Sequence, residues 1–356
     1  KKKNQDSTGR VFDKRGNILK SIYHNLPFQL TQSQINVLKE ISSDLAQTKS
    51  MNRLLQGDVG CGKTIVAILA SAIVLDNNSQ VAILAPTEIL AEQHFKSFKQ
   101  HFNKANVSVG LLIGKMKSKQ KEETLDKISN SEINIIVGTH ALLQENVSFK
   151  DLGLIIIDEQ HRFGVSHRKK IVDKGLNPDI LSMTATPIPR TLSITIHGDM
   201  DISIINELPK NRATVKTKVI AESKINETYQ LMINEMNQNH QCFIVYPIIE
   251  ESEKLDLKAA TTAFNDLKNT IFKKFHVGYI DGRMKKEDRD NEMLKFLNKE
   301  TQCLVSTTVI EVGIDIPNAT VMLIENADRF GLSQLHQLRG RIGRGDKKGY
   351  CFLVKN

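Results

Sequence analysis

Two acidic residues follow directly on an apolar run near the middle of the chain. The isoleucines at 155–157 precede Asp158 and Glu159, and Gln160 and His161 come next. An apolar run of this kind predicts a buried strand. Carboxylates at the end of such a strand can hold Mg²⁺ and polarise a water for phosphate hydrolysis. We therefore expect Asp158 to bind Mg²⁺ through water and Glu159 to orient or deprotonate the attacking water.

A second candidate segment, residues 57–64, has the sequence G-D-V-G-C-G-K-T and matches the pattern G-x-x-x-x-G-K-[ST]. A strand pattern precedes it and a helix pattern follows, so its backbone N–H groups can close around phosphate oxygens at a helix N-terminus. Lys63 is expected to reach the β and γ phosphates, and Thr64 to hold Mg²⁺. The segment thus predicts a site for ATP and Mg²⁺. Its nucleotide-binding residues are Gly57, Asp58, Val59, Gly60, Cys61, Gly62, Lys63 and Thr64.

An arginine-rich segment at residues 337–344, Q-L-R-G-R-I-G-R, supplies a third set of candidates. Arg341 and Arg344 lie one turn apart, and Gln337 opens the segment. Planar guanidinium groups suit the charge that develops on a γ-phosphate, and arginines used in this way contribute on the order of 10³ to 10⁵ in rate. We assign the three residues to catalysis. The alternative is a basic loop on a nucleic-acid face.

Other residues near these segments have simpler explanations. A redox switch is one interpretation of Cys61, but a small side chain tolerated in the loop is the simpler one. His161 and His167 have no third ligand at metal spacing, so we assign no metal to them. Phe330 is assigned to core packing in preference to stacking on a base.

Short apolar runs alternate with amphipathic segments from Pro27 onward, which predicts βαβ units and parallel sheets. The polar, proline-containing segment at 206–212 is placed at a boundary. The predicted domains are 1–24, a basic linker or the ragged end of an excised piece, 25–208 and 209–356. No sequence repeat is obvious between the two lobes, so any duplication is expected in fold alone. Strands are expected at 53–56, 81–85, 107–112, 133–138, 154–158, 180–184, 217–220, 242–246, 277–280, 303–306, 321–325 and 350–354, and helices at 63–75 and 89–102.

The composition is that of an ordinary globular protein, with 40% hydrophobic and 25% charged residues, which excludes disordered and collagen-like classes. The longest apolar stretch, 64–75, is too short to span a bilayer, and no signal peptide is visible. The four cysteines lack C-x-x-C spacing, so neither zinc nor disulfides are supported and reduced, cytoplasmic thiols are expected. The net charge of +9 fits a polyanionic partner such as nucleic acid without requiring one.

Together these segments resemble those of the superfamily 2 helicases, and within them the RecG-type branch-migration helicases of bacteria. The resemblance runs from about Leu26 to Val354 and implies an α/β fold of two tandem RecA-like parallel-sheet lobes with an ATP cleft between them. Besides the segments already described, it is carried by F-Q-L-T-Q-S-Q at 28–34, A-P-T-E-I-L-A-E-Q-H at 85–94, V-G-T-H-A-L-L at 137–143, M-T-A-T-P-I-P-R-T-L at 183–192, T-T-V-I-E-V-G-I-D-I-P-N-A at 307–319 and R-F-G-L-S-Q-L-H-Q-L-R-G-R-I-G-R-G at 329–345.

The resemblance also implies roles for individual residues. Gln34 matches the position that binds adenine, and Gly313 and Asp315 match a second-lobe motif that closes on the nucleotide and the strand. Thr184 and Thr186 match a motif that relays the nucleotide state to the strand-binding face; a satisfied pair of turn hydroxyls is the alternative. Positions that match contacts to the nucleic-acid backbone, where base identity is ignored, are Pro86, Thr87, Gln93, Gly114, Thr139 and His140.

The activity implied by the resemblance is ATP-driven remodelling of branched DNA, by fork regression and by branch migration of four-way junctions. The implied partners are forks, four-way junctions and duplex arms of DNA, with a single-strand-binding protein as a further partner. A monomer in the bacterial cytoplasm, at the nucleoid, is expected. Family members also carry an amino-terminal wedge domain of OB type and a helical hairpin after the last strand. Because neither is found in these residues, we expect a helicase core that binds ATP but remodels forks poorly.

Three alternatives remain open. One is a duplex DNA translocase of the transcription-repair coupling type, although Gln160 and the segment L-S-Q-L-H-Q are closer to the RecG type. Another is an RNA helicase. The third is a non-catalytic, nucleotide-gated binding module, which is disfavoured because each expected phosphate, magnesium, water and arginine position is filled.

Overall fold

The computed structural model describes residues 9–185, 200–209, 214–247, 253–307, 316–343 and 347–355. The chain divides into two compact units, Lys1–Pro209 and Lys210–Asn356. Four residues with predicted roles lie outside the described residues: Thr186, Gly313, Asp315 and Arg344. Within the described ranges, no helix is long and apolar enough to cross a membrane.

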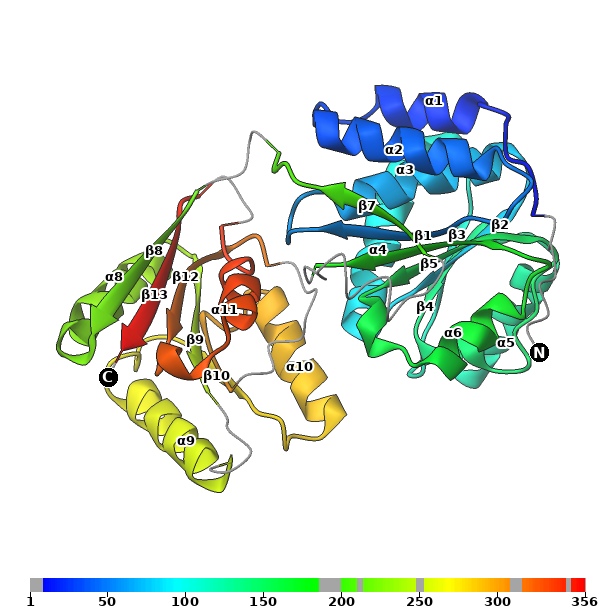
Figure 1. Ribbon diagram of the computed structural model, residues 1–356. Coiled ribbons are helices and arrows are strands. Elements are labelled where there is room, and N and C mark those ends of the chain that lie inside the picture. Colours follow the sequence, from blue (N-terminus) through cyan, green and yellow to red (C-terminus); the bar gives the residue numbers. More distant parts are fainter. Residues whose placement is uncertain are drawn as a thin grey trace, which may run out of the picture. The chain divides into compact units, whose positions relative to one another are not determined.

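The first unit is built on a parallel sheet whose seven strands, in the described part of the chain, run in the order β3-β4-β2-β5-β6-β1-β7 (Figure 1). All residues of the central strand β5 are buried, because helices cover both faces of the sheet. This order places the ends of β5, β6 and β1 side by side, with Asp158 paired to Met183 and Gln56 to Thr184. The strands are β1 (Asn52–Gly57), β2 (Gln80–Leu84), β3 (Val109–Leu112), β4 (Ile135–Gly138), β5 (Leu152–Asp158), β6 (Asp179–Thr184) and β7 (Asp201–Ile205).

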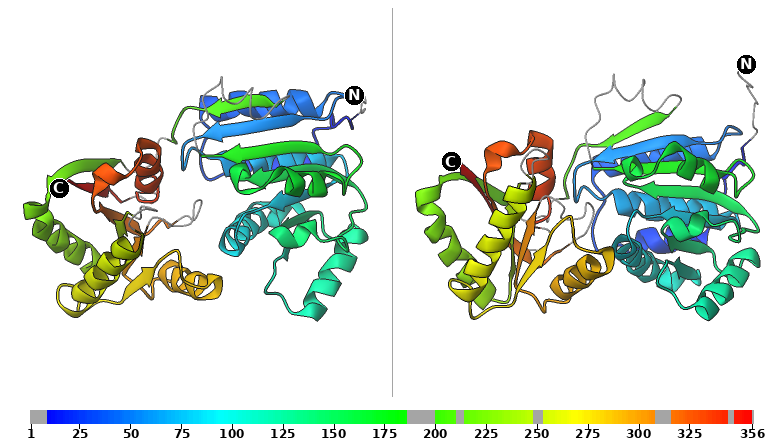
Figure 2. Two further views of the ribbon diagram at one scale, coloured as in Figure 1. Left: turned by 60° about the horizontal axis from the view of Figure 1, so that its bottom comes forward. Right: turned by 90° about the horizontal axis from the view of Figure 1, so that it is seen from below.

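Helices lie on both faces of this sheet (Figure 2). The helix α3 is buried along nearly its whole length, since it lies against the sheet and is covered by α1 and α2. On the opposite face, α5 and α6 pack through Ile128 and Ile171 against Ile155 and Ile157 of β5. The helices of this unit are α1 (Asn17–His24), α2 (Gln32–Leu45), α3 (Lys63–Asp76), α4 (Glu88–Phe102), α5 (Ser118–Ser129) and α6 (Val165–Val172).

Residues 9–24 differ from the linker that their basic composition predicted. The side chains of Phe12 and Ile22 are each only 2% exposed, and Arg10 forms an ion pair with Asp151. The Asp76 carboxylate, at the end of α3, accepts three hydrogen bonds of 2.9 to 3.1 Å from backbone N–H groups at the start of α1. A few well-spaced apolar residues therefore fasten this segment to the first unit despite the many charges around them.

The second unit contains another parallel sheet, whose six strands in the described ranges follow the order β10-β11-β9-β12-β13-β8. All the strands expected from the sequence are confirmed in both units, with ends shifted by a few residues. Strand β7 was not expected; it lies at the edge of the first sheet and mixes exposed with buried positions. The strands of the second unit are β8 (Val215–Ala221), β9 (Gln241–Tyr246), β10 (Val277–Ile280), β11 (Cys303–Thr307), β12 (Ala319–Ile324) and β13 (Gly349–Lys355).

Helices also cover both faces of the second sheet. Tyr229 and Met232 of α8 pack with Phe272 on one face. On the other face, the ring of Phe243 in β9 lies 4.8 Å from the ring of Phe296 in α10. The helices are α8 (Ile225–Asn237), α9 (Glu253–Asn269), α10 (Lys286–Leu297) and α11 (Leu332–Arg339).

Candidate functional site

The loop between β1 and α3 has a backbone that requires its glycines. Gly60 and Gly62 adopt φ angles of +79° and +91°, which side chains other than glycine rarely tolerate. At Gly57 a Cβ would lie 2.5 Å from the Cys61 Sγ, so a larger residue has no room. The loop runs directly into Lys63, the first residue of α3, where the helix dipole favours negative charge. This geometry is that of a phosphate-binding loop.

The ammonium group of Lys63 is held inside this loop. Its Nζ donates hydrogen bonds to the backbone oxygens of Gly57, at 2.7 Å, and of Asp58, at 3.1 Å. Phosphate oxygens bind an ammonium group more strongly than neutral carbonyls do, because both partners are then charged. Lys63 is therefore already positioned where a nucleotide phosphate can replace its carbonyl partners.

Gln34 connects the first turn of α2 to the phosphate loop. Its Oε1 accepts a hydrogen bond from Thr31 N, its own N–H donates to Thr31 Oγ1, and the pair caps α2. Its Nε2 donates to Cys61 O at 2.7 Å, and the side chain is buried. A Cβ on Gly62 would lie 2.2 Å from this nitrogen, a second reason for glycine there. The adenine contact expected of Gln34 stays a prediction; in this structure its carboxamide supports the loop.

The thiol of Cys61 is enclosed by the loop. All four cysteines are free and buried, and burial raises the pKa of the Cys61 thiol above its usual value. Only the thiolate is reactive in thiol chemistry. The structure therefore favours the interpretation of Cys61 as a small packed side chain over that of a redox switch.

Asp158 ends β5 with its carboxylate held from two sides. Its Oδ1 accepts a hydrogen bond from Glu159 N at 3.0 Å, and its Oδ2 accepts one from His94 Nε2 at 2.7 Å. Burial alone would raise the pKa of this carboxyl, but the hydrogen bond and charge of His94, with the charge of Lys63 and the Glu159 N–H, hold the pKa below its usual value. Asp158 is thus an ionised carboxylate beside the phosphate loop.

Glu159 follows in a left-handed backbone conformation, with φ +47°. Such a conformation is strained for a residue other than glycine, and strain of this kind clusters at functional sites. The carboxylate is buried, and its Oε2 lies 3.6 Å from His161 Nδ1. The ring of His167 packs at 4.9 Å against that of His140.

His94 is a site residue that the sequence analysis missed. It lies on α4 in a stripe that otherwise consists of Leu90, Phe98 and Phe102, each at most 2% exposed. A histidine in an apolar helical stripe needs a buried hydrogen-bond partner. That signal was present in the sequence, but the partner was not identifiable without the fold.

Residues expected near a nucleic-acid backbone follow neighbouring strands of the first sheet. Pro86 and Thr87 follow β2, Gly114 follows β3, and Thr139 and His140 follow β4. Because β3, β4 and β2 are adjacent and parallel, their carboxyl ends meet at one edge. Thr87 also caps α4, since its Oγ1 accepts a hydrogen bond from Leu90 N at 3.3 Å.

Gln93 and Thr184 are two further candidates of the first unit. Gln93 lies on α4, directly before His94. A cavity of about 260 Å³ opens beside His140 and is lined also by Leu143, Gln144, Glu145, His167 and Lys170. Thr184, at the end of β6, is fully buried, which suits a role inside the unit more than direct contact with a strand.

In the second unit the arginine-rich segment begins in the last turn of α11, and its described part continues to Gly343. Gln337 is in the helix, and Arg341 lies just beyond it with only 2% of its surface exposed. Arg339 serves the fold, because it donates hydrogen bonds to Thr217 Oγ1 at 3.1 Å and to Val215 O at 3.2 Å on β8. The catalytic roles of Gln337 and Arg341 remain predictions.

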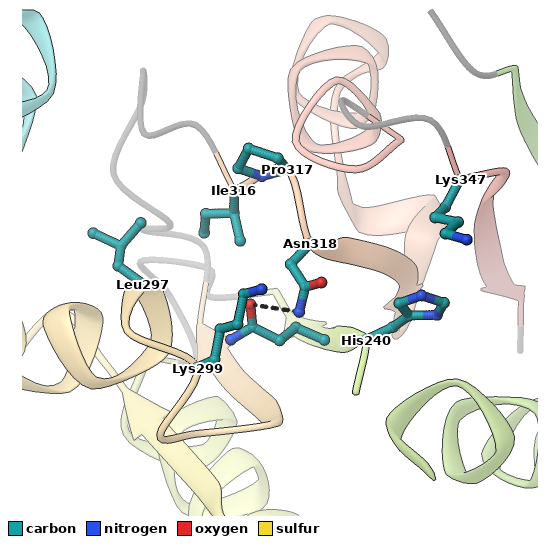
Figure 3. Close-up of a pocket in the computed structure, with 8 residues that line it drawn as sticks. His240, Leu297, Lys299, Ile316, Pro317, Asn318 and Lys347 are labelled. Atoms are coloured by element: carbon teal, nitrogen blue, oxygen red, sulfur yellow. Dashed lines mark hydrogen bonds between the residues drawn. The ribbon is translucent and has the colours of Figure 1, made fainter. Parts of the chain in front are cut away.

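A separate cavity of about 370 Å³ lies in the second unit (Figure 3). It is found where β9 and β12 begin, and the hydrogen bond from Asn318 Nδ2 to Gln241 Oε1 joins two of its lining residues. Ligands of parallel sheets bind beyond the carboxyl ends of the strands. This cavity is at the opposite ends and is not a candidate for the nucleotide. Its lining residues are His240, Gln241, Leu297, Lys299, Ile316, Pro317, Asn318 and Lys347.

Each of the two units matches a model of a known protein family. Residues 31–194 match the family model of the DEAD/DEAH box helicases, and residues 223–346 match that of the helicase conserved C-terminal domain. The ATP-dependent DNA helicase RecG of Synechocystis sp. is 49% identical over 99% of this chain and 42% of the relative. That of Aquifex aeolicus is 52% identical over 94% of this chain and 42% of the relative.

Solved structures agree with these matches. A structure of RecG bound to a three-way DNA junction superposes with a TM-score of 0.84 at 43% identity, covering 98% of this chain and 46% of that chain. A yeast Dbp5 structure at 18% identity, with a TM-score of 0.66, supports the fold alone. The chain spans less than half the length of these RecG relatives. It belongs to the RecG family of superfamily 2 helicases and carries the two tandem RecA-like helicase domains of that family.

Proposed function

We propose that the chain is an ATP-dependent DNA translocase that remodels branched DNA. One observation carries the proposal. The pKa of Asp158, at the end of β5, is lowered in part by the positive charge of Lys63, which is held in a formed phosphate loop. The relatives are named ATP-dependent DNA helicases, and one is solved on a three-way DNA junction. Fork regression and branch migration of four-way junctions are the reactions that we assign to it.

The described residues fit a magnesium ion. The lowered pKa of Asp158 keeps its carboxylate ionised, and Thr64 brings a hydroxyl to the start of α3. Oxygen ligands of this kind suit Mg²⁺, and an ion held by Asp158 and Thr64 would neutralise phosphate charge on a bound nucleotide. Lys63 binds the same phosphates, and Glu159 orients or deprotonates the attacking water. Asp158 and Thr64 are thus the proposed magnesium residues.

Further roles follow from the family. Gln34 is proposed to contact adenine, and Gln337, Arg341 and Arg344 to stabilise charge on the γ-phosphate. Gly313 and Asp315 are proposed to bind nucleotide and strand. Thr184 and Thr186 relay the nucleotide state. The strand is proposed to contact Pro86, Thr87, Gln93, Gly114, Thr139 and His140.

Family membership also supports proposals about the cellular setting. We propose a monomer in the cytoplasm of a bacterium, at the nucleoid. Forks, four-way junctions and duplex arms are the proposed DNA partners, and a single-strand-binding protein is a further proposed partner.

The ATP site is tested by replacing Lys63. Lys63→Ala should abolish ATP turnover, because it removes the ammonium group that the loop holds at Gly57 O and Asp58 O, where the phosphates are proposed to bind. Turnover is measured by phosphate release with and without DNA. Lys39→Ala, an exposed lysine on α2, is the matched control and should turn over ATP as the unsubstituted chain does. A DNA-stimulated rate that survives Lys63→Ala would remove the assignment.

The substrate is tested by comparing nucleic acids. ATP turnover is measured with a fork, a four-way junction, plain duplex DNA, single-stranded DNA and RNA. The proposal expects branched DNA to stimulate turnover most. Stimulation by RNA above DNA would establish an RNA helicase instead, and displacement of a stalled RNA polymerase would favour the transcription-repair coupling type. Nucleotide binding without turnover on any of them would indicate a binding module.

A further inference from the structure

We propose that His94 is a positioning residue through which DNA bound at the start of α4 acts on Asp158. The inference rests on the proposed function, because it assumes that the first turn of α4 contacts a DNA strand. The structure connects that DNA contact to Asp158, the residue proposed to hold Mg²⁺, through the helix α4 and the hydrogen bond of His94.

The helix α4 begins at the proposed DNA contact and reaches the carboxylate two turns later. Thr87 caps its first turn, and His94 lies seven residues further on, about 10 Å along the axis at 1.5 Å per residue. Leu90, Phe98 and Phe102 anchor the same face of the helix, each at most 2% exposed. A continuous helix of this length moves as one rigid element, because its backbone hydrogen bonds are internal. Displacement at Thr87 is thereby passed to His94.

The hydrogen bond between His94 and Asp158 links movement of α4 to the carboxylate. Nε2 and Oδ2 are 2.7 Å apart, and the residues are 7% and 8% exposed. In this pair the imidazole Nε2 is the donor, because the carboxylate oxygen of an aspartate is an acceptor. A short bond between two enclosed groups holds the carboxylate plane in one orientation. Movement of the imidazole therefore turns or shifts the carboxylate.

The two oxygens of Asp158 are held by different elements. Oδ1 accepts from Glu159 N, which belongs to the same turn and moves with β5. Oδ2 accepts from His94, on a helix that also carries Thr87 and Gln93. Only the second bond joins the carboxylate to an element with proposed DNA contacts. His94 is therefore the described residue through which strand binding can reorient Asp158.

Thermodynamic reciprocity states what such a coupling between the DNA site and the Mg²⁺ site must show. If DNA changes how well Asp158 holds Mg²⁺, then Mg²⁺ with nucleotide must change the affinity for DNA by the same factor. In the unsubstituted chain we expect this factor to be on the order of five or more, as for other coupled sites. Without the His94 bond, the two binding events should become nearly independent.

The experiment measures this coupling directly. A fluorescent ADP analogue is bound to the full chain while Mg²⁺ is titrated, with and without a DNA fork, and the apparent Mg²⁺ affinities are compared. The variants are His94→Leu and His94→Phe, which fill the apolar stripe without a donor, and His94→Gln, which keeps an N–H donor. His101→Gln is the matched control, since His101 is on the same helix but its Nδ1 bonds to Ser97 O. ATP turnover with and without DNA is recorded in parallel.

The expected result separates the variants by their donor. His94→Leu and His94→Phe should bind the ADP analogue, which shows that they are folded, yet lose most of the effect of DNA on Mg²⁺ affinity and on turnover. His94→Gln should retain much of it, and His101→Gln all of it. Unchanged coupling in a folded donor-free variant would overturn the inference. So would an equal loss of turnover with and without DNA while the coupling persists. Absence of DNA-stimulated turnover in the unsubstituted chain would instead overturn the proposed function.

Discussion

The turn after β5 in the first unit and the turn after β12 in the second share one backbone conformation. Glu159 and Asn326 are both left-handed, with φ of +47° and +46°, and each is followed by a 3₁₀ turn, Gln160–Arg162 and Ala327–Arg329. A helix then begins after a glycine in both units. The sequences R-F-G-V-S at 162–166 and R-F-G-L-S at 329–333 correspond. The expectation that the duplication is one of fold alone was therefore wrong at this turn.

The two turns differ in the carboxylate that they deliver. Asp158 meets His94 and Lys63, which hold its pKa below the usual value against the effect of burial. Glu325, at the matching position, is raised to a pKa of about 7 by burial and by the negative charge of Glu222. The same backbone device thus produces an ionised ligand in one unit and a carboxyl that is half protonated near neutral pH in the other. Neighbouring residues, not the turn, decide the chemistry.

The largest effect is expected from neutralising the two carboxyls. Asp158→Asn should lower ATP turnover by on the order of 10² to 10³, because it removes a charge that acts on the metal and phosphates. Glu325→Gln should leave turnover within about threefold, a difference too small to indicate a lost transition-state contact. Phosphate release at saturating ATP and DNA measures both. A comparable loss of ATP turnover in the two variants would show that the two carboxyls do not differ in function.

A buried glutamine at the start of a central strand is a second duplicated device. The Nε2 of Gln80 in β2 donates to the backbone oxygens of Ile128 and Ile133. The Nε2 of Gln241 in β9 donates to those of Phe296 and Thr301. In each unit one carboxamide thereby joins the end of a helix to the segment that leads into the neighbouring strand.

Removing these carboxamides should destabilise each unit separately. Gln80→Ala is expected to cost about 3 kcal/mol, because it leaves buried backbone groups without partners. The Oε1 of Gln80 also accepts from the N–H groups of Lys150 and Asp151. Gln241→Ala should cost somewhat less, since its Oε1 accepts from the Asn318 side chain. Hydrogen exchange, followed in peptides from the two units, measures the loss in each. Loss of protection in both units from either change would show that they do not open independently.

A smaller effect is expected from the pH dependence of Glu325. Its folded pKa of about 7 exceeds the ordinary value of 4.5, so the folded state binds the proton more tightly than the unfolded state does. The associated stability is complete below pH 4.5 and is lost as pH rises to about 7. Glu325→Gln removes this loss and should raise the stability of the second unit at pH 8, relative to pH 5, by about 1 to 2 kcal/mol. Urea unfolding at the two pH values, followed by hydrogen exchange in the second unit, tests it. An equal gain at both values would contradict the raised pKa.

Much of this fold could be predicted because its strands are apolar on both faces. The runs that became β2, β5 and β9 are continuous and bounded by polar residues, so their apolar composition and short length located them. Strand β7 was missed because an edge strand is covered on fewer sides and keeps polar positions. The segment at 9–24 was missed because its burial depends on a few apolar residues and on Asp76, which is distant in the sequence.

The candidate site also contains residues that could be predicted from the sequence and residues that could not. The phosphate loop and Asp158 were predictable because their chemistry depends on residues that are close in sequence or that end a strand. His94 was not, since its partner is 64 residues away and only the packing of α4 on the first sheet brings the two together. The support given by Gln34 to the loop was also unexpected, because it depends on where α2 begins relative to Cys61.

The attachment of α1 to the end of α3 has a consequence for how the first unit opens. The helix α3 carries apolar side chains all round, and no face of it can be left in water without a large cost. Separation of α1, with release of the N–H groups held by Asp76, would uncover such a face. The short helix α1 would fray readily by itself, yet its amides should exchange with solvent as slowly as those of α3. The two helices therefore form one cooperative unfolding unit, and the helix that presents the phosphate loop is protected by residues 9–24.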